Sequence, residues 1–160
     1  MQSQFKMGAI AGFAASIAVA AMEVVNMFAL PTITEFPTLL ATIAGMPDQP
    51  AVGWVLHILA GTLILGPAFA YVAPRLPTDT SGTKGILFSV AAWILMMFTV
   101  APMADLGLFA VRAGFGTIAW MLAIHVVFGI VLGTVYGEQR KKARAAERAA
   151  ASDPGAAAAA

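Results

Sequence analysis

The sequence contains no cysteine, and only 11% of its 160 residues are charged. The absence of cysteine excludes disulfides, thiolate metal ligands and cysteine nucleophiles. The low charge, combined with an apolar fraction of 60%, is atypical of a water-soluble domain. The sequence also lacks a phosphate-binding loop, an HExxH metal motif and a serine–histidine–aspartate spacing, so an enzyme that acts on lipid is the least favoured function. The one basic cluster directly follows an apolar run, and nothing indicates nucleic-acid binding.

Four apolar runs are each long enough to cross the roughly 30 Å hydrocarbon core of a bilayer. They cover about residues 7–30, 51–73, 85–104 and 115–137. Because lipid offers no hydrogen-bond partner to the backbone, runs of this length form helices. We therefore predict an all-α, four-helix transmembrane bundle over residues 1–137, followed by a basic, alanine-rich cytoplasmic tail over residues 138–160. The helix of that tail is expected to stop at residues 153–155, Asp-Pro-Gly.

The positions of lysine and arginine predict the orientation of the chain in a membrane. Only Arg112 lies in the connection between the third and fourth runs. The other cations lie before the first run, between the second and third, or after the fourth: Lys6, Arg75, Lys84, Arg140, Lys141, Lys142, Arg144 and Arg148. By the positive-inside rule both termini are cytoplasmic. The cations of the tail are expected to contact anionic lipid headgroups.

An alternative interpretation of the first run is a cleavable signal peptide, because a cation precedes it and small residues follow at Ala18-Val19-Ala20. The run continues to about Leu30, however, which exceeds the roughly 7–15 apolar residues of an ordinary signal peptide. We therefore expect the first run to be a membrane span.

The sequence is typical of a duplicated helical hairpin. A Lys-x-Gly or Lys-Gly pair opens the first and third runs, at residues 6–8 and 84–85. A tryptophan followed by histidine and then, four residues later, glycine recurs in the second and fourth runs, as Trp54, His57 and Gly61 and as Trp120, His125 and Gly129. The two histidines would then lie on equivalent helices that run in the same direction.

The connections contain two further local signals. Between the first two runs, Pro37 and Gly45 suit the first turn and the end of a short helix over the outer mouth of the bundle. An apolar loop packed on neighbouring helices is the alternative. Within the second run, Pro67 predicts a kink near residues 63–66.

The few polar residues of the apolar runs gather toward the outer half of the predicted bundle. At about 1.5 Å per residue, Glu23, Asn26 and His57 lie within two turns of the outer surface and His125 within three. Asp105 and Arg112 reach the same face. We therefore predict an outer polar cluster formed by Glu23, Asn26, His57, Asp105 and His125. Ionisable groups inside membranes are costly and usually face a partner or a cavity.

Three functions are compatible with this polar cluster. In the first, the polar groups hydrogen-bond one another and fix the helix packing of a small structural or accessory protein, which associates with a larger membrane complex or a second copy. In the second, His57 and His125 ligate haem b, Gly61 and Gly129 leave room for the macrocycle, and Arg112 meets the propionates. A transition metal held by His57, His125 and Glu23 is a variant of the second.

The third function is a proton-coupled carrier of small molecules in which Glu23 gains and loses the proton. A single glutamate in the first of four helices resembles the small multidrug resistance transporters. The long connections, the charge bias and the two histidines of this chain depart from that family.

Two motifs carry a further resemblance: Gly53-Trp54-x2-His57-x3-Gly61 and His125-x3-Gly129-x3-Gly133-x2-Tyr136-Gly137. With them the chain resembles an uncharacterised family of small bacterial membrane proteins, defined only as a domain of unknown function, over about residues 7–137. The resemblance implies four helices and a bacterial inner membrane, and it implies no activity.

Overall fold

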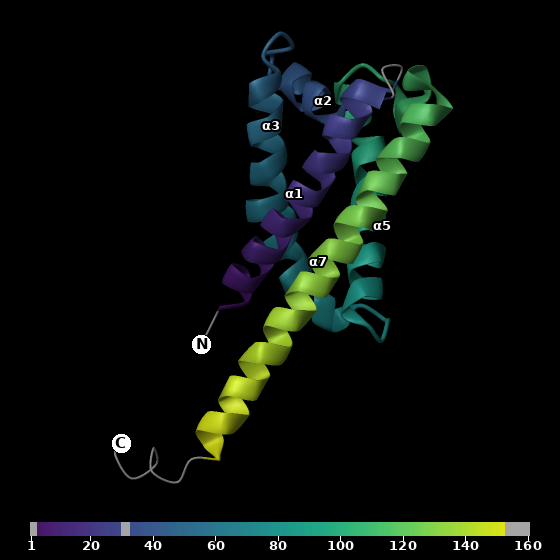
Figure 1. Cartoon of the computed structure of the whole chain (residues 1–160). Helices are drawn as coiled ribbons and strands as arrows, with labels where there is room; N and C mark the ends of the chain where they lie inside the picture. Colours follow the sequence, from purple (N-terminus) through teal and green to yellow (C-terminus); the bar gives the residue numbers. More distant parts are fainter. Residues whose placement is uncertain (1–2, 30–32, 153–160) are drawn as a thin grey trace.

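The computed structural model describes residues 3–29 and 33–152, and the regular structure within these ranges is entirely helical. The first element, α1, spans Gln4–Ala29. A short helix, α2 (Phe36–Ile43), follows α1 and leads into the second of four long helical elements (Figure 1). The second long element consists of α3 (Pro50–Leu59), the π-helix η1 (Ala60–Leu65), α4 (Gly66–Val72) and the 3₁₀ turn η2 (Ala73–Arg75). The remaining elements are α5 (Ser81–Phe98), α6 (Val100–Met103), the 3₁₀ segment η3 (Leu108–Ala113) and α7 (Gly114–Ala151).

The structure has four helical stretches that are long and apolar enough to cross a membrane, Gln4–Ala29, Pro50–Arg75, Ser81–Met103 and Leu108–Ala151. Each overlaps one of the predicted apolar runs, so the prediction of four long apolar helices in an all-α chain is confirmed. The predicted end of the first run at Leu30 and the predicted stop at residues 153–155 lie outside the described residues. No interruption separates the apolar part of α7 from the basic tail.

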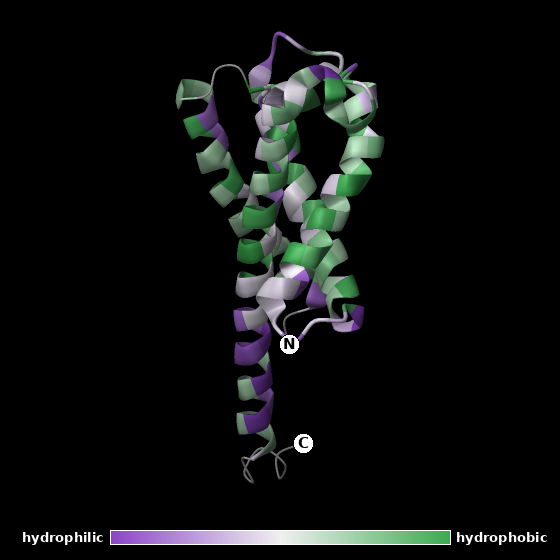
Figure 2. Cartoon of the chain, turned by 90° about the vertical axis from the view of Figure 1, so that its right-hand side faces the viewer, coloured by the Kyte–Doolittle hydropathy of each residue, from purple (hydrophilic) through white to green (hydrophobic). Residues whose placement is uncertain are grey.

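Consecutive long helices run in opposite directions, which gives the bundle two distinct ends (Figure 1). The start of α1, the connection between η2 and α5, and the extension of α7 lie at one end, which we call the tail end. The other end, here called the loop end, carries α2 and η3. The extension of α7 is mostly hydrophilic where it leaves the apolar bundle (purple in Figure 2).

Glycines allow the backbones of the long helices to touch. In the first hairpin, a Cβ built on Gly12 would collide with the backbone of Gly61 and Gly66, so α1 contacts the second long element directly. In the second hairpin, a Cβ on Gly85 of α5 would collide with the backbone of Gly129 and Gly133 of α7. Small residues at such contacts let helices gain van der Waals contact and are a common basis of packing between apolar helices.

The two hairpins meet where α1 packs against α7. A core cluster there combines α1, α4 and α7, with Phe69, Ile124 and Leu132 almost completely buried. A second core cluster lies toward the loop end, where Met97 of α5 and Met121 of α7 pack beneath α2 and η3. The face of α1 that carries the small residues Gly8, Gly12 and Ala15 is buried, and small residues let neighbouring helices approach closely.

The irregularity expected at Pro67 takes the form of the π-helix η1. The backbone N–H of Gly66 donates to the carbonyl of Gly61, five residues earlier, immediately before the proline. Proline cannot donate to the carbonyl four residues before it, and a π turn is one way in which a helix accommodates this loss.

The connections at the loop end are both structured. The short helix expected between the first two runs is α2, which has Pro37 in its first turn and is followed by Gly45 with φ of +74°. In the other connection, Asp105, Phe109 and Ala110 adopt left-handed backbone conformations, which cost energy for residues other than glycine. Phe109 packs edge-on against Trp93 and Phe98 of α5, which helps to hold this conformation.

Candidate functional site

The polar site begins on α1, one turn from its end at the loop end. Glu23 and Asn26 are completely buried and lie three residues apart, so their side chains share one face of the helix. The amide Nδ2 of Asn26 donates to Oε2 of Glu23 over 3.5 Å and also lies 3.5 Å from the carbonyl oxygen of Ile33. Asn26 thereby connects the glutamate to the chain segment that enters α2.

Glu23 receives its other hydrogen bond from a distant part of the sequence. The indole Nε1 of Trp120 on α7 donates to Oε1 of Glu23 over 3.3 Å. The backbone of Phe36, at the start of α2, lies near the same carboxylate. A buried carboxylate needs such donors because burial removes it from water. Glu23 therefore links α1 to α7 beside the start of α2.

His57 lies on α3 and is 6% exposed. Its ring Nε2 lies 3.3 Å from the carbonyl oxygen of Ser16 on α1. A carbonyl oxygen only accepts hydrogen bonds, so this nitrogen is the donor and Nδ1 carries the lone pair in the neutral ring. This bond joins the second long element to α1 at the start of the π-helix.

His125 lies on α7 and is half-buried. Its ring Nδ1 donates to the carbonyl oxygen of Met121, one turn earlier, over 2.7 Å, which leaves the lone pair on Nε2. Its own backbone carbonyl accepts a hydrogen bond from the hydroxyl of the buried Ser89 on α5. The two histidines thus present opposite ring nitrogens as unprotonated acceptors.

A cavity of about 70 Å³ lies between the two histidines. Phe36 contacts both imidazoles edge-on, with ring centroids 5.8 Å from His57 and 6.5 Å from His125. Gly61 and Phe128 also line the cavity, which is otherwise apolar. In the neutral rings the unprotonated nitrogens have no hydrogen-bond partner within the described part of the chain. A space of this size holds about two water molecules.

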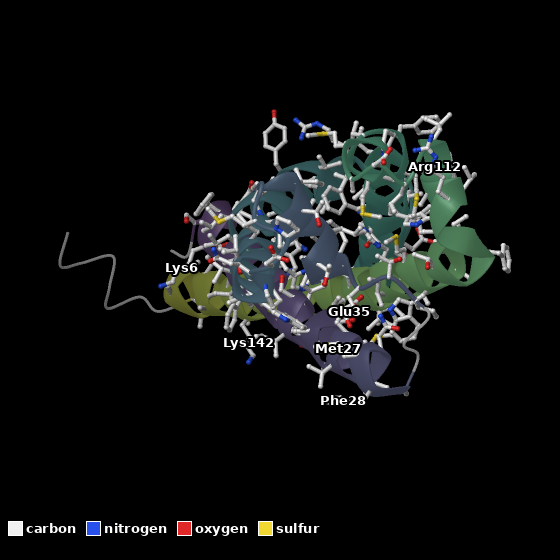
Figure 3. All side chains as sticks on the ribbon, turned by 90° about the horizontal axis from the view of Figure 1, so that it is seen from above. Lys6, Met27, Phe28, Glu35, Arg112 and Lys142 are labelled. Atoms are coloured by element: carbon white, nitrogen blue, oxygen red, sulfur yellow. The ribbon has the colours of Figure 1, made fainter. Side chains whose placement is uncertain are left out.

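Several residues predicted to belong to the site lie elsewhere. Asp105 and Arg112 form an ion pair of 2.6 Å at the loop end, where their side chains are 94% and 66% exposed, so neither belongs to the buried cluster. In the view along the bundle Arg112 lies at the periphery (Figure 3). Gly129 does not line the cavity, because the backbone of α5 at Gly85 fills the space beside it.

The structure does not bring the predicted metal set together. Among residues 3–29 and 33–152, no three side chains of histidine, aspartate or glutamate are grouped so that they could hold a metal ion. Glu23 bonds to Trp120 and Asn26, whereas the two histidines each bond to a backbone carbonyl. Glu23 and the histidines therefore form two separate parts of the polar site.

Two residues at the centre of the site, Trp120 and Phe36, were not predicted from the sequence. A partly buried tryptophan usually directs its N–H to an acceptor, so Trp120, five residues before His125, was a candidate partner for a buried carboxylate. Phe36 has no comparable signal, since its role follows from the position of α2 over the bundle.

The fold and the site define a class: a helical bundle with four long apolar helices and a polar site between them. Comparison with known protein families likewise identifies a family without assigning a function. The model of a family of unknown function, DUF6789, matches residues 2–147, and the chain belongs to this family. No curated protein matches the chain. No solved structure matches it either.

Proposed function

We propose that the chain is a small multi-spanning protein of the bacterial inner membrane, with both termini in the cytoplasm and a structural or accessory role. The four long apolar helices and their outward-facing apolar side chains support a membrane location; Phe13, Ile17, Leu63 and Leu95 are each 48–64% exposed. The positive-inside rule supports the orientation, because every cation except Arg112 lies toward the tail end. In this role the protein packs against a larger complex or a second copy.

The observation that carries the structural role is the pattern of polar bonds between helices. Four buried polar side chains form hydrogen bonds that join different long elements. Glu23 joins α1 to α7, His57 joins α3 to α1, and Ser89 joins α5 to α7. Tyr136 of α7 adds a bond to the carbonyl of Ala70 on α4. Such bonds contribute modestly to stability, but together they specify one helix packing.

The orientation is tested with single cysteines, which the chain allows because it has none of its own. Asp48→Cys at the loop end and Glu147→Cys on the tail are both exposed positions. In intact cells, a membrane-impermeant maleimide that enters the periplasm is expected to label Asp48→Cys only, and both variants after lysis. Labelling of Glu147→Cys in intact cells would overturn the orientation.

The structural role predicts that His57→Ala weakens the bundle without the loss of any bound species. The substitution removes the bond to Ser16 and is expected to lower the free energy of unfolding in detergent by roughly 0.6–2 kcal/mol. Thermal unfolding followed by helical circular dichroism measures this change. Unaltered unfolding of both His57→Ala and Trp120→Phe would contradict a structural role of the polar site.

A specific observation favours the cofactor hypothesis as a second candidate: both histidines line one cavity and keep a free ring nitrogen. At about 70 Å³, however, the cavity is far smaller than the several hundred Å³ of ordinary ligand pockets, and Phe36 occupies the space beside both rings. A macrocycle would have to displace Phe36. An absorption spectrum of the oxidised and reduced protein, with elemental analysis, decides the matter. A Soret band lost in His57→Ala would favour haem, and a stoichiometric metal would favour a metal site.

The carrier hypothesis depends on Glu23, whose burial is unusual for a glutamate. Proton flux into liposomes measures this activity. A carrier would lose coupled flux on Glu23→Gln, whereas a structural glutamate would leave the liposomes without substrate-dependent flux in either form.

A further inference from the structure

A basic pocket of about 250 Å³ lies at the tail end, between α7 and the connection that joins η2 to α5. Four cations line it, Lys84, Arg140, Lys141 and Arg144, together with a single carboxylate, that of Asp79. The wall toward the bundle includes the apolar side chains of Phe69 and Ala73. The pocket thus lies where the apolar helices end and the basic extension of α7 begins.

Close helix packing builds this pocket. Gly133 and Gly137 of α7 have no side chain to keep Ser81 away, so the first turn of α5 lies directly on α7. Arg140 and Arg144 follow on α7 one and two turns after Tyr136, on the same face. The guanidinium of Arg140 lies 6.0 Å from the centre of the Tyr136 ring. Arg140, which is half-buried, is therefore held beside the start of α5, and Arg144 continues the same face of α7 at an exposed position.

The positive charge of the pocket is poorly compensated. Lys141 forms an ion pair of 2.7 Å with Glu138. No ion pair involves Lys84, Arg140 or Arg144 within the residues that the structure describes. Lys84 lies near the N-terminus of α5, whose first turn contains no acidic residue, and its Nζ donates to the carbonyl of Ala73 over 3.0 Å. The N-terminus of a helix carries a partial positive charge, so a cation beside it is disfavoured. An anion bound at this place would offset both positive charges.

We propose that the basic pocket binds the phosphate of one anionic phospholipid headgroup per chain. Guanidinium groups bind phosphate oxygens with two parallel hydrogen bonds, and lysine adds a point charge. The apolar wall suits the start of an acyl chain, which a soluble phosphate lacks. Basic pockets between membrane helices on the cytoplasmic side are places where anionic headgroups bind. Binding of one headgroup in this pocket differs from a general attraction of the basic tail to the membrane surface. The proposal rests on the proposed membrane location.

Native mass spectrometry of the protein in non-ionic detergent tests the proposal, with phosphatidylglycerol and phosphatidylcholine as the added lipids. The wild type is expected to retain one phosphatidylglycerol in preference to phosphatidylcholine. Arg140→Gln and Arg144→Gln should each weaken this binding about fivefold, as expected for the loss of one charge near the headgroup. Arg144 is exposed, so its substitution serves if Arg140→Gln fails to fold.

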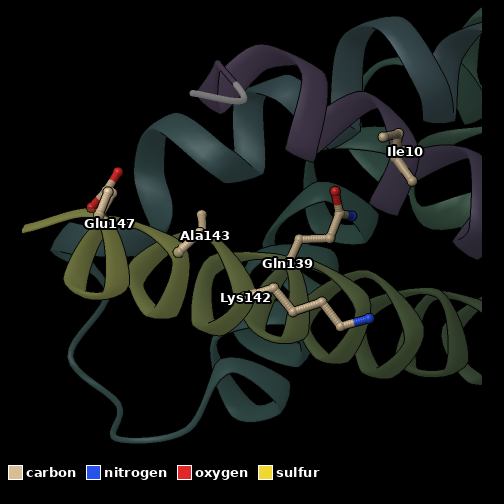
Figure 4. A pocket seen from close by; sticks show the side chains of 7 residues that line it. Ile10, Gln139, Lys142, Ala143 and Glu147 are labelled. Carbon is tan, nitrogen blue, oxygen red and sulfur yellow. The ribbon is translucent and has the colours of Figure 1, made fainter. Parts of the chain in front are cut away.

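Lys142 offers a matched control on the same helix. It lies between the two arginines in sequence but lines a different feature, an open groove of about 720 Å³ that Ile10 of α1 also borders (Figure 4). Lys142→Gln removes the same charge and is expected to leave retention of phosphatidylglycerol unchanged. Without added lipid, all three variants should unfold at the same temperature as the wild type.

Three results would overturn the proposal. The first is equal weakening by Lys142→Gln and Arg140→Gln, which indicates general charge attraction. The second is equal retention of the two lipids. The third is retention of inorganic phosphate, added in place of the lipids, to the same extent as phosphatidylglycerol, which would assign the pocket to a soluble phosphate. Because the measurement is made in detergent, its failure leaves the cysteine-labelling test of orientation unaffected.

Discussion

Glu23 owes its place in the structure to groups that lie far away in the sequence. Its carboxylate, buried on α1, is bonded by the indole of Trp120 on α7 and by the amide of Asn26. An unpaired buried carboxylate would carry a large desolvation penalty, so these donors are needed for the helix to pack as it does. The polar site is therefore part of the fold, whatever else it does.

The bond between Glu23 and Trp120 can be measured by a double-mutant cycle. Trp120→Phe removes the indole donor while keeping an aromatic ring, and Glu23→Met removes the acceptor oxygens while keeping a side chain of similar length. Each change is expected to lower the free energy of unfolding in detergent by roughly 0.6–2 kcal/mol. Because the two groups bond each other, the double variant should lose less than the sum. Strictly additive losses would show that the bond contributes nothing.

The tautomers of the two histidines follow from their carbonyl partners. His57 donates from Nε2 to Ser16, and His125 donates from Nδ1 to Met121. The neutral rings should therefore be opposite tautomers. Solid-state ¹⁵N spectra of the protein labelled at histidine should show one ring protonated at Nε2 and the other at Nδ1, with His57→Asn removing the first. Two rings of the same tautomer would contradict these hydrogen bonds.

At the residue scale, the position of a polar residue along its helix could be predicted from the sequence. The direction in which its side chain points, into the bundle or away from it, could not. Counting residues placed Glu23, Asn26 and both histidines toward the outer end; in the structure Glu23 and Asn26 lie in the last two turns of α1, and the two histidines share one cavity. The same count wrongly added Asp105, which has the right height but points outward and pairs with Arg112. The bond between Glu23 and Trp120 was missed because it depends on how two helices are rotated about their axes, which the sequence of either helix alone does not determine.

At the scale of elements, the same local motif has different neighbours in the two hairpins. Gly61 and Gly129 both follow a histidine by four residues, yet Gly61 lines the cavity whereas Gly129 contacts the backbone of α5. The four long helices themselves were predictable because lipid requires long apolar runs to be helical. The π-helix η1 was not, since Pro67 only requires some irregularity and tertiary contacts select its form.

The contact between α5 and α7 predicts that substitutions at two glycines of α5 differ in their effect on stability. Gly85→Ala would place a methyl group against the backbone of Gly129 and Gly133, and the overpacking should cost about 1–3 kcal/mol of unfolding free energy. Gly82→Ala has its nearest contact at 3.8 Å and should cost nothing, since alanine is favoured over glycine in helices. Thermal unfolding in detergent compares the two. Equal unfolding temperatures would show that α5 and α7 are not in backbone contact.

At the scale of the whole molecule, the bundle is two glycine-packed hairpins joined mainly along α1 and α7. The joining contacts are of a different kind, combining a shared apolar core with polar bonds such as those of Glu23 to Trp120 and of Tyr136 to Ala70. The covalent link between the hairpins is a short exposed connection with turn chemistry, over residues 76–80. The information for joining the hairpins therefore resides in the helices and not in that connection.

The chain is accordingly expected to assemble when it is expressed as two pieces, residues 1–78 and 79–160. Helices that are each stable in a membrane associate afterwards through packing and polar contacts, so a missing connection raises only the entropic cost of their meeting. A tag on the second piece should co-purify the first in equal amounts. The double variant Trp120→Phe with Tyr136→Phe removes two of the polar bonds between the hairpins and should reduce the yield of the first piece, whereas Phe115→Leu, at a position 83% exposed, should not. If the two pieces purify separately in every form, the connection itself holds the hairpins together, and the polar site cannot be what specifies their packing.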